Sequence, residues 1–447
     1  MIGRLFQFFK TGEDKPLIAD QEKITRVYEH TRFNVTWGIL IGYSFFYVCK
    51  VNWSVVKKPM LDAGLLDVKQ MGMIGAALLY TYAFGKFTNG FLADRANIRR
   101  LISTGLLASA VVNLIWGLTT NFLMFVALWG INGWFQSMGS APSVVSICQW
   151  FSNKERGTRY GLWAGAHNLG EGITYVGTAA LVDWLGWRSG FIGPGFVCTI
   201  VAVMLFIVLA DRPQTYGLPH VADYKQDYSA GKPKKESVGK LQLQVIKSPV
   251  VWILCASSAL MYMARYAIIS WVILYLQETK GCGLKEASLV MIPYSICGLC
   301  GALFSGYFSD RFFNSRRNIP ALIYGLIEIT AMVILFVIPP GYLWADSLAM
   351  GLFGFGIGGL IVFLAGLMAV DVCPKAAAGA VKGVIGLFSY IGAGCQDWIS
   401  GLLIDSGKMV VAGKTTYNFD YAFYFWIGTS VLSMLLTLTI WNVKPKE

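Results

Sequence analysis

Charged side chains are scarce in this sequence of 447 residues, since 14% of the residues are charged and 55% are hydrophobic. One soluble core cannot bury so large an apolar fraction. Four long stretches contain no Asp, Glu, Lys or Arg: 101–153, 189–210, 347–370 and 421–443. Because a membrane-spanning helix needs about 20 apolar residues, the first stretch holds two spans and each of the others holds one. The composition therefore excludes a soluble protein and predicts an all-α membrane protein.

Histidine is rarer still, with three in the whole chain. The sequence lacks the His/Asp spacing of a metal site and lacks a Ser or Cys placed as an activated nucleophile. It therefore predicts no metal, no cofactor and no enzyme activity such as that of a membrane-embedded phosphatase. Of nine cysteines, only Cys282 is expected outside the membrane, and it has no partner, so we expect no disulfide. The others lie within or beside apolar stretches: Cys49, Cys148, Cys198, Cys255, Cys297, Cys300, Cys373 and Cys395.

Negative charge is the minority sign, with 25 Asp and Glu against 37 Lys and Arg and a net charge of +12. The cations are grouped at alternate ends of the apolar stretches rather than on one soluble surface, which argues against nucleic acid as a partner. By the positive-inside rule, both termini and the central loop are cytoplasmic, so the number of spans is even and about twelve. The first 30 residues lack the apolar core of a cleavable signal peptide. Lys57, Lys58, Lys408 and Lys414 are exceptions that we expect outside.

The polar interval between residues 211 and 248 divides the expected spans into six and six. We predict a cytoplasmic N-terminal segment (1–32), an N-terminal six-helix bundle (33–210), a cytoplasmic linker (211–248), a C-terminal six-helix bundle (249–443) and a cytoplasmic tail (444–447). The spans are expected to begin near Phe33, Gly72, Leu101, Asn121, Gly157, Gly190, Pro249, Ala287, Ile319, Tyr342, Ala378 and Tyr421.

The two halves repeat each other in sequence. A Gly-x-x-x-Asp-Arg element that ends in Asp94 and Arg95 recurs at Asp310 and Arg311, an offset of 216 residues. Two parallel six-helix halves related by a pseudo-twofold axis resemble the major facilitator fold, in which the substrate lies between the halves. We expect these four residues to have a gating or structural role at the cytoplasmic helix ends rather than to contact substrate.

Two cations stand inside predicted spans. Tyr43, Tyr47 and Lys50 share one helix face, and Tyr262 precedes Arg265 as Tyr47 precedes Lys50; the cations are 215 residues apart, close to the repeat offset. A cation in mid-membrane costs at least ~2.5 to 3.5 kcal/mol and normally faces water or a partner. No acidic residue of the neighbouring spans is placed to neutralise both, so an anion such as a phosphate monoester would supply the countercharge. The alternative is that Lys50 snorkels to the surface and Arg265 pairs with a carboxylate.

Other polar groups are candidates for the rest of a ligand. Trp163, His167 and Asn168 share a span with Glu171, and Ser389 and Tyr390 stand on the repeat-related span. His167 could bind phosphate or could hydrogen-bond with Glu171 one turn away. Lys86 could gate the site or snorkel to the membrane surface.

At these residues the chain resembles the organophosphate:phosphate antiporter family of major facilitators. The resemblance rests on segments 42–52, 86–95, 132–136, 166–170, 186–188 and 211–219, and the polar N-terminal segment is most similar to the hexose-phosphate transporters and sensors. It implies phosphate binding by Lys50, Arg265 and His167.

This chain departs from the family pattern at three places. The family usually has Arg followed by Lys where Lys50 and Val51 stand, often has Glu at Ser295, and has an aromatic-Gly-Pro element at residues 358–360. The first departure removes a bidentate phosphate contact, because a lysine lacks the planar fork of an arginine.

The sequence thus favours a hexose 6-phosphate:phosphate antiporter, with glucose 6-phosphate as the expected sugar phosphate. We expect a multi-pass protein of a bacterial inner membrane that works as a monomer. A membrane sugar-phosphate sensor and a glycerol 3-phosphate antiporter are the alternatives.

Overall fold

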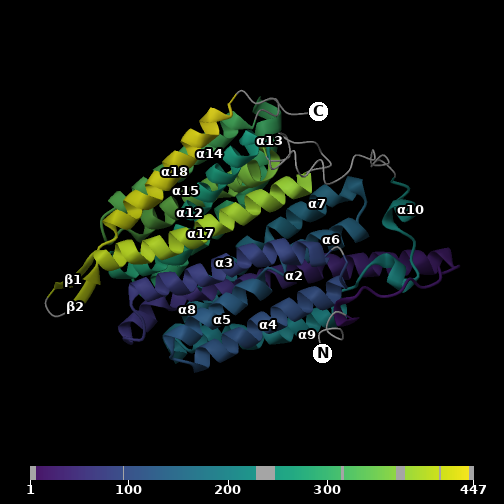
Figure 1. Ribbon diagram of the computed structural model, residues 1–447, viewed down its shortest axis with the longest axis horizontal. Helices are drawn as coiled ribbons and strands as arrows, with labels where there is room; N and C mark the ends of the chain where they lie inside the picture. Colours follow the sequence, from purple (N-terminus) through teal and green to yellow (C-terminus); the bar gives the residue numbers. More distant parts are fainter. Residues whose placement is uncertain are drawn as a thin grey trace.

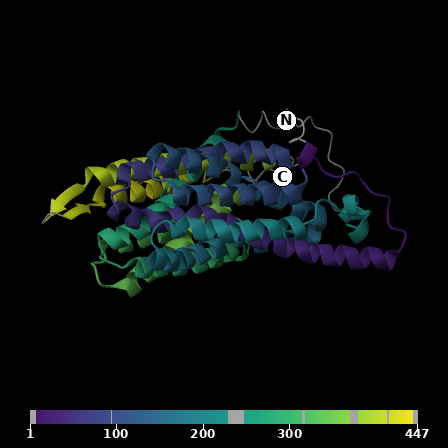
Figure 2. The ribbon, with the colours of Figure 1, turned by 90° about the horizontal axis from the view of Figure 1, so that it is seen from below.

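The computed structural model describes residues 7–93, 95–227, 247–313, 317–368, 378–411 and 414–441. These residues form long helices that run side by side, with one short β-hairpin at one end (Figure 1). The start of the long first helix, α2 (Gln21–Asp62), lies at the opposite end of the molecule, as a second view also shows (Figure 2). We call these two ends the hairpin end and the terminal end.

The helices of the N-terminal part are α2 (Gln21–Asp62), α3 (Val68–Ala93), α4 (Ile98–Leu118), α5 (Phe122–Gln136), α6 (Ser140–Trp150), α7 (Asn153–Ala164), α8 (Ala166–Leu185) and α9 (Ser189–Val208). Two short elements follow, η1 (Pro213–Tyr216) and α10 (Val221–Lys225). The C-terminal part contains α12 (Pro249–Glu278), α13 (Leu284–Phe313), α14 (Asn318–Val337), α15 (Leu343–Val362), the π-helix η2 (Phe363–Leu367), α17 (Ala378–Ser406) and α18 (Asp420–Thr439). Strands β1 (Lys408–Val411) and β2 (Lys414–Tyr417) form the antiparallel hairpin.

Eight of the described helices are long and apolar enough to cross a membrane: α2, α4, α9, α12, α13, α14, α15 with η2, and α18. Large apolar side chains on their outer faces are exposed, for example Ile207 (72%) and Leu303 (61%), as expected for surfaces that contact lipid. The remaining long elements lie between these eight in the chain: α3 between α2 and α4, the pairs α5–α6 and α7–α8 between α4 and α9, and α17 between α15 and α18. Twelve spans therefore stay a prediction, while the multi-pass helical architecture is confirmed.

The first span begins earlier than expected. Helix α2 starts at Gln21 instead of near Phe33, because the Asp20 carboxylate caps it by accepting hydrogen bonds from the backbone N–H groups of Glu22 (2.9 Å) and Lys23 (3.2 Å). Part of the segment 1–32 is thus a continuation of the first membrane helix, and it projects beyond the other helices at the terminal end (Figure 2).

The helices of each half pack mainly on one another, and the halves meet along three pairs: α3 with α17, α8 with α13, and α2 with α12. Glycines allow the closest approach. A Cβ on Gly72 of α3 would lie 2.6 Å from the Asp397 carbonyl oxygen and 3.0 Å from Gly401 Cα, both on α17. A larger residue at Gly72 would therefore push the halves apart in this region.

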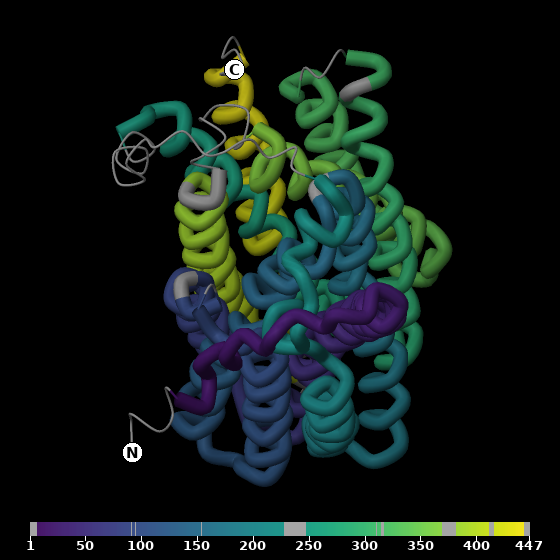
Figure 3. Tube along the Cα trace, turned by 90° about the vertical axis from the view of Figure 1, so that its right-hand side faces the viewer, coloured from purple at the N-terminus to yellow at the C-terminus, as the bar shows by residue number. Residues whose placement is uncertain are grey.

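At the terminal end, the N-terminal segment crosses the bundle before α2 begins (Figure 3). Asp211 joins this segment to the bundle. Its buried carboxylate accepts hydrogen bonds from Thr11 Oγ1 (2.6 Å), Gly12 N (3.3 Å), Asn97 Nδ2 (3.1 Å) and Ile98 N (3.1 Å). This arrangement gives a structural reason for the acidic residue that opens the 211–219 segment.

Candidate functional site

Lys50 lies deep in the protein, on α2, with 7% of its surface exposed. Its ammonium group donates a hydrogen bond to the Tyr266 hydroxyl at 2.9 Å. It also lies over the rings of Tyr82 (4.7 Å), Tyr47 (4.9 Å), Tyr266 (5.3 Å) and Tyr390 (5.7 Å). Tyrosine faces attract a cation but do not neutralise it. In the described part of the chain Lys50 therefore has uncharged partners, two of them from the opposite half.

Arg265 has a different environment on α12. It is 3% exposed, and its Nη2 lies 3.4 Å from Oε1 of Glu171, which is fully buried on α8 of the other half. The guanidinium carbon is 5.7 Å from the ring centres of both Tyr262 and Tyr266. The expectation that both cations lack a countercharge is therefore wrong for Arg265. Ser295 supplies no carboxylate, but Glu171 reaches the same arginine from across the interface.

Tyr266 connects the two cations, because both lie within 6 Å of its ring at the distances given above. Its ring also contacts those of Tyr262 (6.1 Å) and Tyr390 (5.8 Å), and Tyr390 contacts Tyr82 at 4.5 Å. Lys50 and Tyr266 line a cavity of about 40 Å³ that extends toward Ser270. The two halves thus contribute two cations to one aromatic cluster.

His167 stands where α7 gives way to α8. Its Nδ1 donates a hydrogen bond to the Ala164 carbonyl oxygen at 2.6 Å, and its ring lies 5.7 Å from that of Tyr47. Glu171 pairs with Arg265, and His167 bonds to Ala164, so the structure has these two contacts in place of the alternative hydrogen bond between His167 and Glu171. His167 lies beside the aromatic wall of the Lys50 site.

The remaining predicted ligand residues divide into two groups. The Tyr43 ring contacts the Trp163 ring at 4.7 Å with a tilt of 35° and lies next to Tyr47 (5.5 Å). Asn168, on the same helix as His167, faces α13. Ser389 differs, because its fully buried hydroxyl bonds with Ser258 Oγ (2.8 Å) and with the Ile385 carbonyl oxygen (2.7 Å). The Ser389 side chain joins α12 to α17.

Lys86 is half-buried on α3. Its Nζ lies 5.0 Å from the Tyr390 ring, which places a third cation beside the aromatic cluster. Arg95 and Arg311 are exposed at the terminal ends of α3 and α13. Asp94 and the side chain of Asp310 lie outside the described residues, so the predicted role of that motif stays a prediction.

Two lysines that the sequence placed outside the membrane link the halves near the hairpin end. Lys57 is fully buried, donates a hydrogen bond to Ser270 Oγ at 2.9 Å and lies 3.5 Å from the Trp271 ring centre. Lys58 forms an ion pair with Glu278 of α12 at 2.6 Å and another with Asp62. These contacts, together with the close approach of α3 and α17 at Gly72 and Gly401, hold the two halves together near the hairpin end.

Comparisons with known proteins agree with this architecture. Residues 39–395 match the family described as the Major Facilitator Superfamily. A solved bacterial homologue of the human lysosomal transporter Spinster, in an inward-facing and occupied conformation, superposes with a TM-score of 0.74 over 92% of this chain and 97% of that chain, at 16% identity. At that identity the likeness shows the fold alone.

Curated relatives cover almost the whole chain. The glycerol-3-phosphate transporter of Bacillus subtilis is 30% identical over 96% of both chains. The membrane sensor protein UhpC of Salmonella typhimurium is 33% identical over 88% of this chain and 90% of its own. A probable hexose phosphate transport protein of Chlamydia pneumoniae is 28% identical over 99% of this chain and 98% of its own. The family is one of transporters rather than enzymes. The chain belongs to the Major Facilitator Superfamily, in the branch that contains these organophosphate transporters and the related sensor.

Proposed function

We propose that this protein is a hexose 6-phosphate:inorganic phosphate antiporter that works by alternating access, with glucose 6-phosphate as the expected organic substrate. One observation carries the proposal: Lys50 and Arg265 come from opposite halves and meet at the same tyrosine ring. A phosphate monoester carries about −1.5 to −2 charges and three acceptor oxygens, which suits one ammonium and one guanidinium group. Both inorganic phosphate and a sugar phosphate offer this group.

The proposed mechanism starts from the partners of Lys50 and Arg265 in this structure. Lys50 bonds to Tyr266, and Arg265 pairs with Glu171, so each cation reaches across the interface. A phosphoryl group that arrives between the halves would replace these two links with stronger charge-assisted hydrogen bonds. Bound phosphate then holds the halves together while the lysine contacts at the hairpin end open. Because only the loaded protein gains this attraction, phosphate and sugar phosphate exchange one for the other.

The rest of the substrate would be recognised by groups on α7, α8 and α17. Trp163 and Tyr390 offer aromatic surface to a hexose ring, and Asn168 offers an amide for its hydroxyl groups. Ser389 is better assigned to holding α12 against α17, because its hydroxyl is already bonded on both sides. His167 is placed beside Tyr47 to support the phosphate end.

In this proposal the terminal end faces the cytoplasm, in accordance with the positive-inside rule. The protein would then lie in a bacterial inner membrane, with the two six-helix bundles and the linker as the sequence divides them, and a single chain would contain the complete site.

Counterflow tests the proposal. Purified protein in vesicles loaded with phosphate should take up labelled glucose 6-phosphate, and empty vesicles should not. Equal uptake without internal phosphate or organophosphate would contradict exchange. The alternative is a glycerol 3-phosphate antiporter, which the Bacillus subtilis relative supports. Competition by glycerol 3-phosphate for glucose 6-phosphate uptake tests this alternative.

A sensor is the other candidate function, and the 33% identity to UhpC supports it. A sensor would bind glucose 6-phosphate with little flux. Binding at micromolar concentrations together with no measurable counterflow in the same preparation would favour the sensor over the antiporter.

A further inference from the structure

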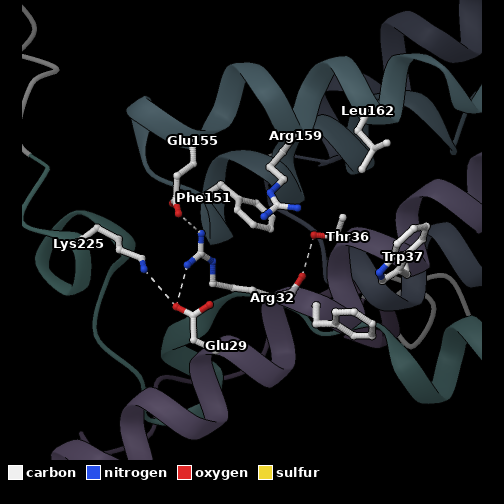
Figure 4. Close-up of a pocket in the computed structure, with 10 residues that line it drawn as sticks. Glu29, Arg32, Thr36, Trp37, Phe151, Glu155, Arg159, Leu162 and Lys225 are labelled. Atoms are coloured by element: carbon white, nitrogen blue, oxygen red, sulfur yellow. Dashed lines mark hydrogen bonds and ion pairs between the residues drawn. The ribbon is translucent and has the colours of Figure 1, made fainter.

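A second cavity lies at the terminal end of the N-terminal half, away from the cations of the central site. It has a volume of about 330 Å³. The first turns of α2, the junction of α6 with α7, and α10 form its walls, and its side chains are drawn in Figure 4. The lining residues are Glu29, Arg32, Phe33, Thr36, Trp37, Phe151, Glu155, Arg159, Leu162 and Lys225.

The inner wall of this cavity is a fixed ionic structure. Arg32 is 5% exposed and reaches Glu29 at 2.9 Å and Glu155 at 2.6 Å, while its guanidinium lies 4.7 Å from the Phe151 ring (Figure 4). Glu29 also accepts from Lys225 at 3.1 Å. Because two carboxylates already surround Arg32, its charge is not available for a ligand.

Among the described residues, Arg159 is the cation of this lining that no carboxylate contacts. Its guanidinium carbon lies 5.2 Å from the centre of the Phe151 ring, so that this ring contacts both Arg32 and Arg159 (Figure 4). The lining contains three cations, Arg32, Arg159 and Lys225, and two carboxylates, so the cavity has an excess of one positive charge. A cavity with this excess suits an anion beside Arg159.

The rim of the cavity is apolar and faces outward. Phe33, Trp37 and Leu162 are 63%, 45% and 43% exposed, although all three stand on helices that pack in the membrane bundle. Tryptophan prefers the boundary between hydrocarbon and water. A ligand in the cavity would therefore contact a cation inside it and exposed apolar side chains at its rim.

We propose that this cavity binds the headgroup of an anionic phospholipid, with its phosphate on Arg159 and an acyl chain along Phe33, Trp37 and Leu162. Basic pockets between membrane helices are a known means of binding lipid headgroups. The site goes beyond the proposed transport function, because all its residues lie in the N-terminal half and α10 and none belongs to the central site. A lipid there would hold α10 and the first turns of α2 against α7.

The test measures thermal unfolding of the purified full-length protein in detergent micelles that contain phosphatidylglycerol, phosphatidylcholine or neither, with a titration of each lipid. Phosphatidylglycerol should raise the unfolding temperature more than phosphatidylcholine. Arg159→Gln should raise the phosphatidylglycerol concentration needed for a half-maximal rise in unfolding temperature about fivefold. This is the contribution expected of one cation near a membrane surface.

The matched control is Arg99→Gln, since Arg99 also lies over an aromatic ring, that of Phe206 at 4.7 Å, but outside this cavity. It should respond to phosphatidylglycerol like the unsubstituted protein, and Arg159→Lys should keep most of the response. An unchanged response in Arg159→Gln, or an equal effect of phosphatidylcholine, would overturn the proposal. So would an equal effect of inorganic phosphate, which would identify a free anion as the occupant.

Discussion

The sequence repeat relates Lys50 to Arg265, yet the two buried cations have different environments. Lys50 has a hydroxyl and four tyrosine rings around it, whereas Arg265 has a carboxylate at 3.4 Å. Aromatic rings do not neutralise a buried cation, so its charge can still attract an anionic ligand. A cation paired with a carboxylate must first leave that carboxylate before it can bind a ligand. In the proposed mechanism, phosphate would bind Lys50 without displacing a carboxylate, but it would compete with Glu171 for Arg265.

The pairing also shows how the site can report its occupancy. Arg265 and Glu171 belong to opposite halves, so breaking their ion pair changes the attraction between the halves. Lys57 and Lys58 hold the hairpin end by contacts that involve no central-site residue. The contacts of the central site join α2 and α8 to α12, and the lysine contacts at the hairpin end join α2 to α12, so the two sets of contacts are separate.

The largest expected effect comes from removing either cation. Lys50→Ala or Arg265→Ala should weaken phosphate binding about 10- to 100-fold, since a hydrogen bond to a charged group contributes about 1.5–3 kcal/mol. Exchange of labelled phosphate in vesicles should fall accordingly. Lys285→Ala, an exposed cation at the start of α13, is the control and should bind and exchange normally. Normal phosphate binding in either site variant would contradict the assignment.

Glu171→Gln sharpens the comparison because it removes the competitor of phosphate and leaves both cations. We expect phosphate to bind several-fold more tightly, since Arg265 no longer has to leave a carboxylate. We expect slower exchange, because tightly bound phosphate leaves less readily. Equilibrium binding and initial exchange rates separate the two effects. Weaker phosphate binding would mean that Glu171 supports the site by orienting Arg265.

Tyr266→Phe should have a smaller effect, because it removes the hydroxyl that accepts from Lys50 at 2.9 Å and keeps the ring that both cations share. The hydrogen bond lost, about 0.5–1.5 kcal/mol, belongs to the empty site and is the one that phosphate would replace, so its loss predicts a two- to tenfold fall in the phosphate concentration at half-maximal exchange. Tyr275→Phe is the matched control on the same helix, since its hydroxyl bonds to the Leu335 carbonyl oxygen. A loss as large as that of Lys50→Ala would show that the hydroxyl itself binds phosphate strongly.

The smallest expected change concerns the organic part of the substrate. Asn168→Ala should weaken the binding of glucose 6-phosphate by a few-fold, as expected for the loss of one hydrogen bond. The affinity for inorganic phosphate should not change. Ser389→Ala should affect neither ligand, because the Ser389 hydroxyl is bonded within the C-terminal half. Competition of each ligand with labelled phosphate measures both. Equal weakening of the two ligands in Asn168→Ala would remove Asn168 from the sugar site.

The positions of Lys50 and Arg265 could be predicted because a cation inside an apolar span is rare and the repeat relates the two. Their partners could not. Whether Lys50 meets Tyr266 and whether Arg265 meets Glu171 depends on how each helix is rotated and how the two halves face each other. Helical periodicity predicts which residues share a face of one helix, but it does not predict which residue of another helix lies opposite.

Other differences have local causes. The burial of Lys57 could not be predicted, because α2 continues to Asp62 and the opposite half places Trp271 against the lysine. The hairpin after α17 was missed, because its two short strands bury little and pair only with each other. The overall fold followed from composition and from the repeat, which depend on many residues rather than on a single contact.

The central claim is that Lys50 and Arg265 hold the same phosphoryl group, and a double-mutant cycle of phosphate binding tests it most directly. Phosphate dissociation constants would be measured for the unsubstituted protein, Lys50→Ala, Arg265→Ala and the double variant. If both cations bind one phosphoryl group, the double variant should lose clearly less affinity than the two single losses combined, with a coupling above about 0.5 kcal/mol. Additive losses within that margin would mean that the two cations act at separate places, and would contradict the account.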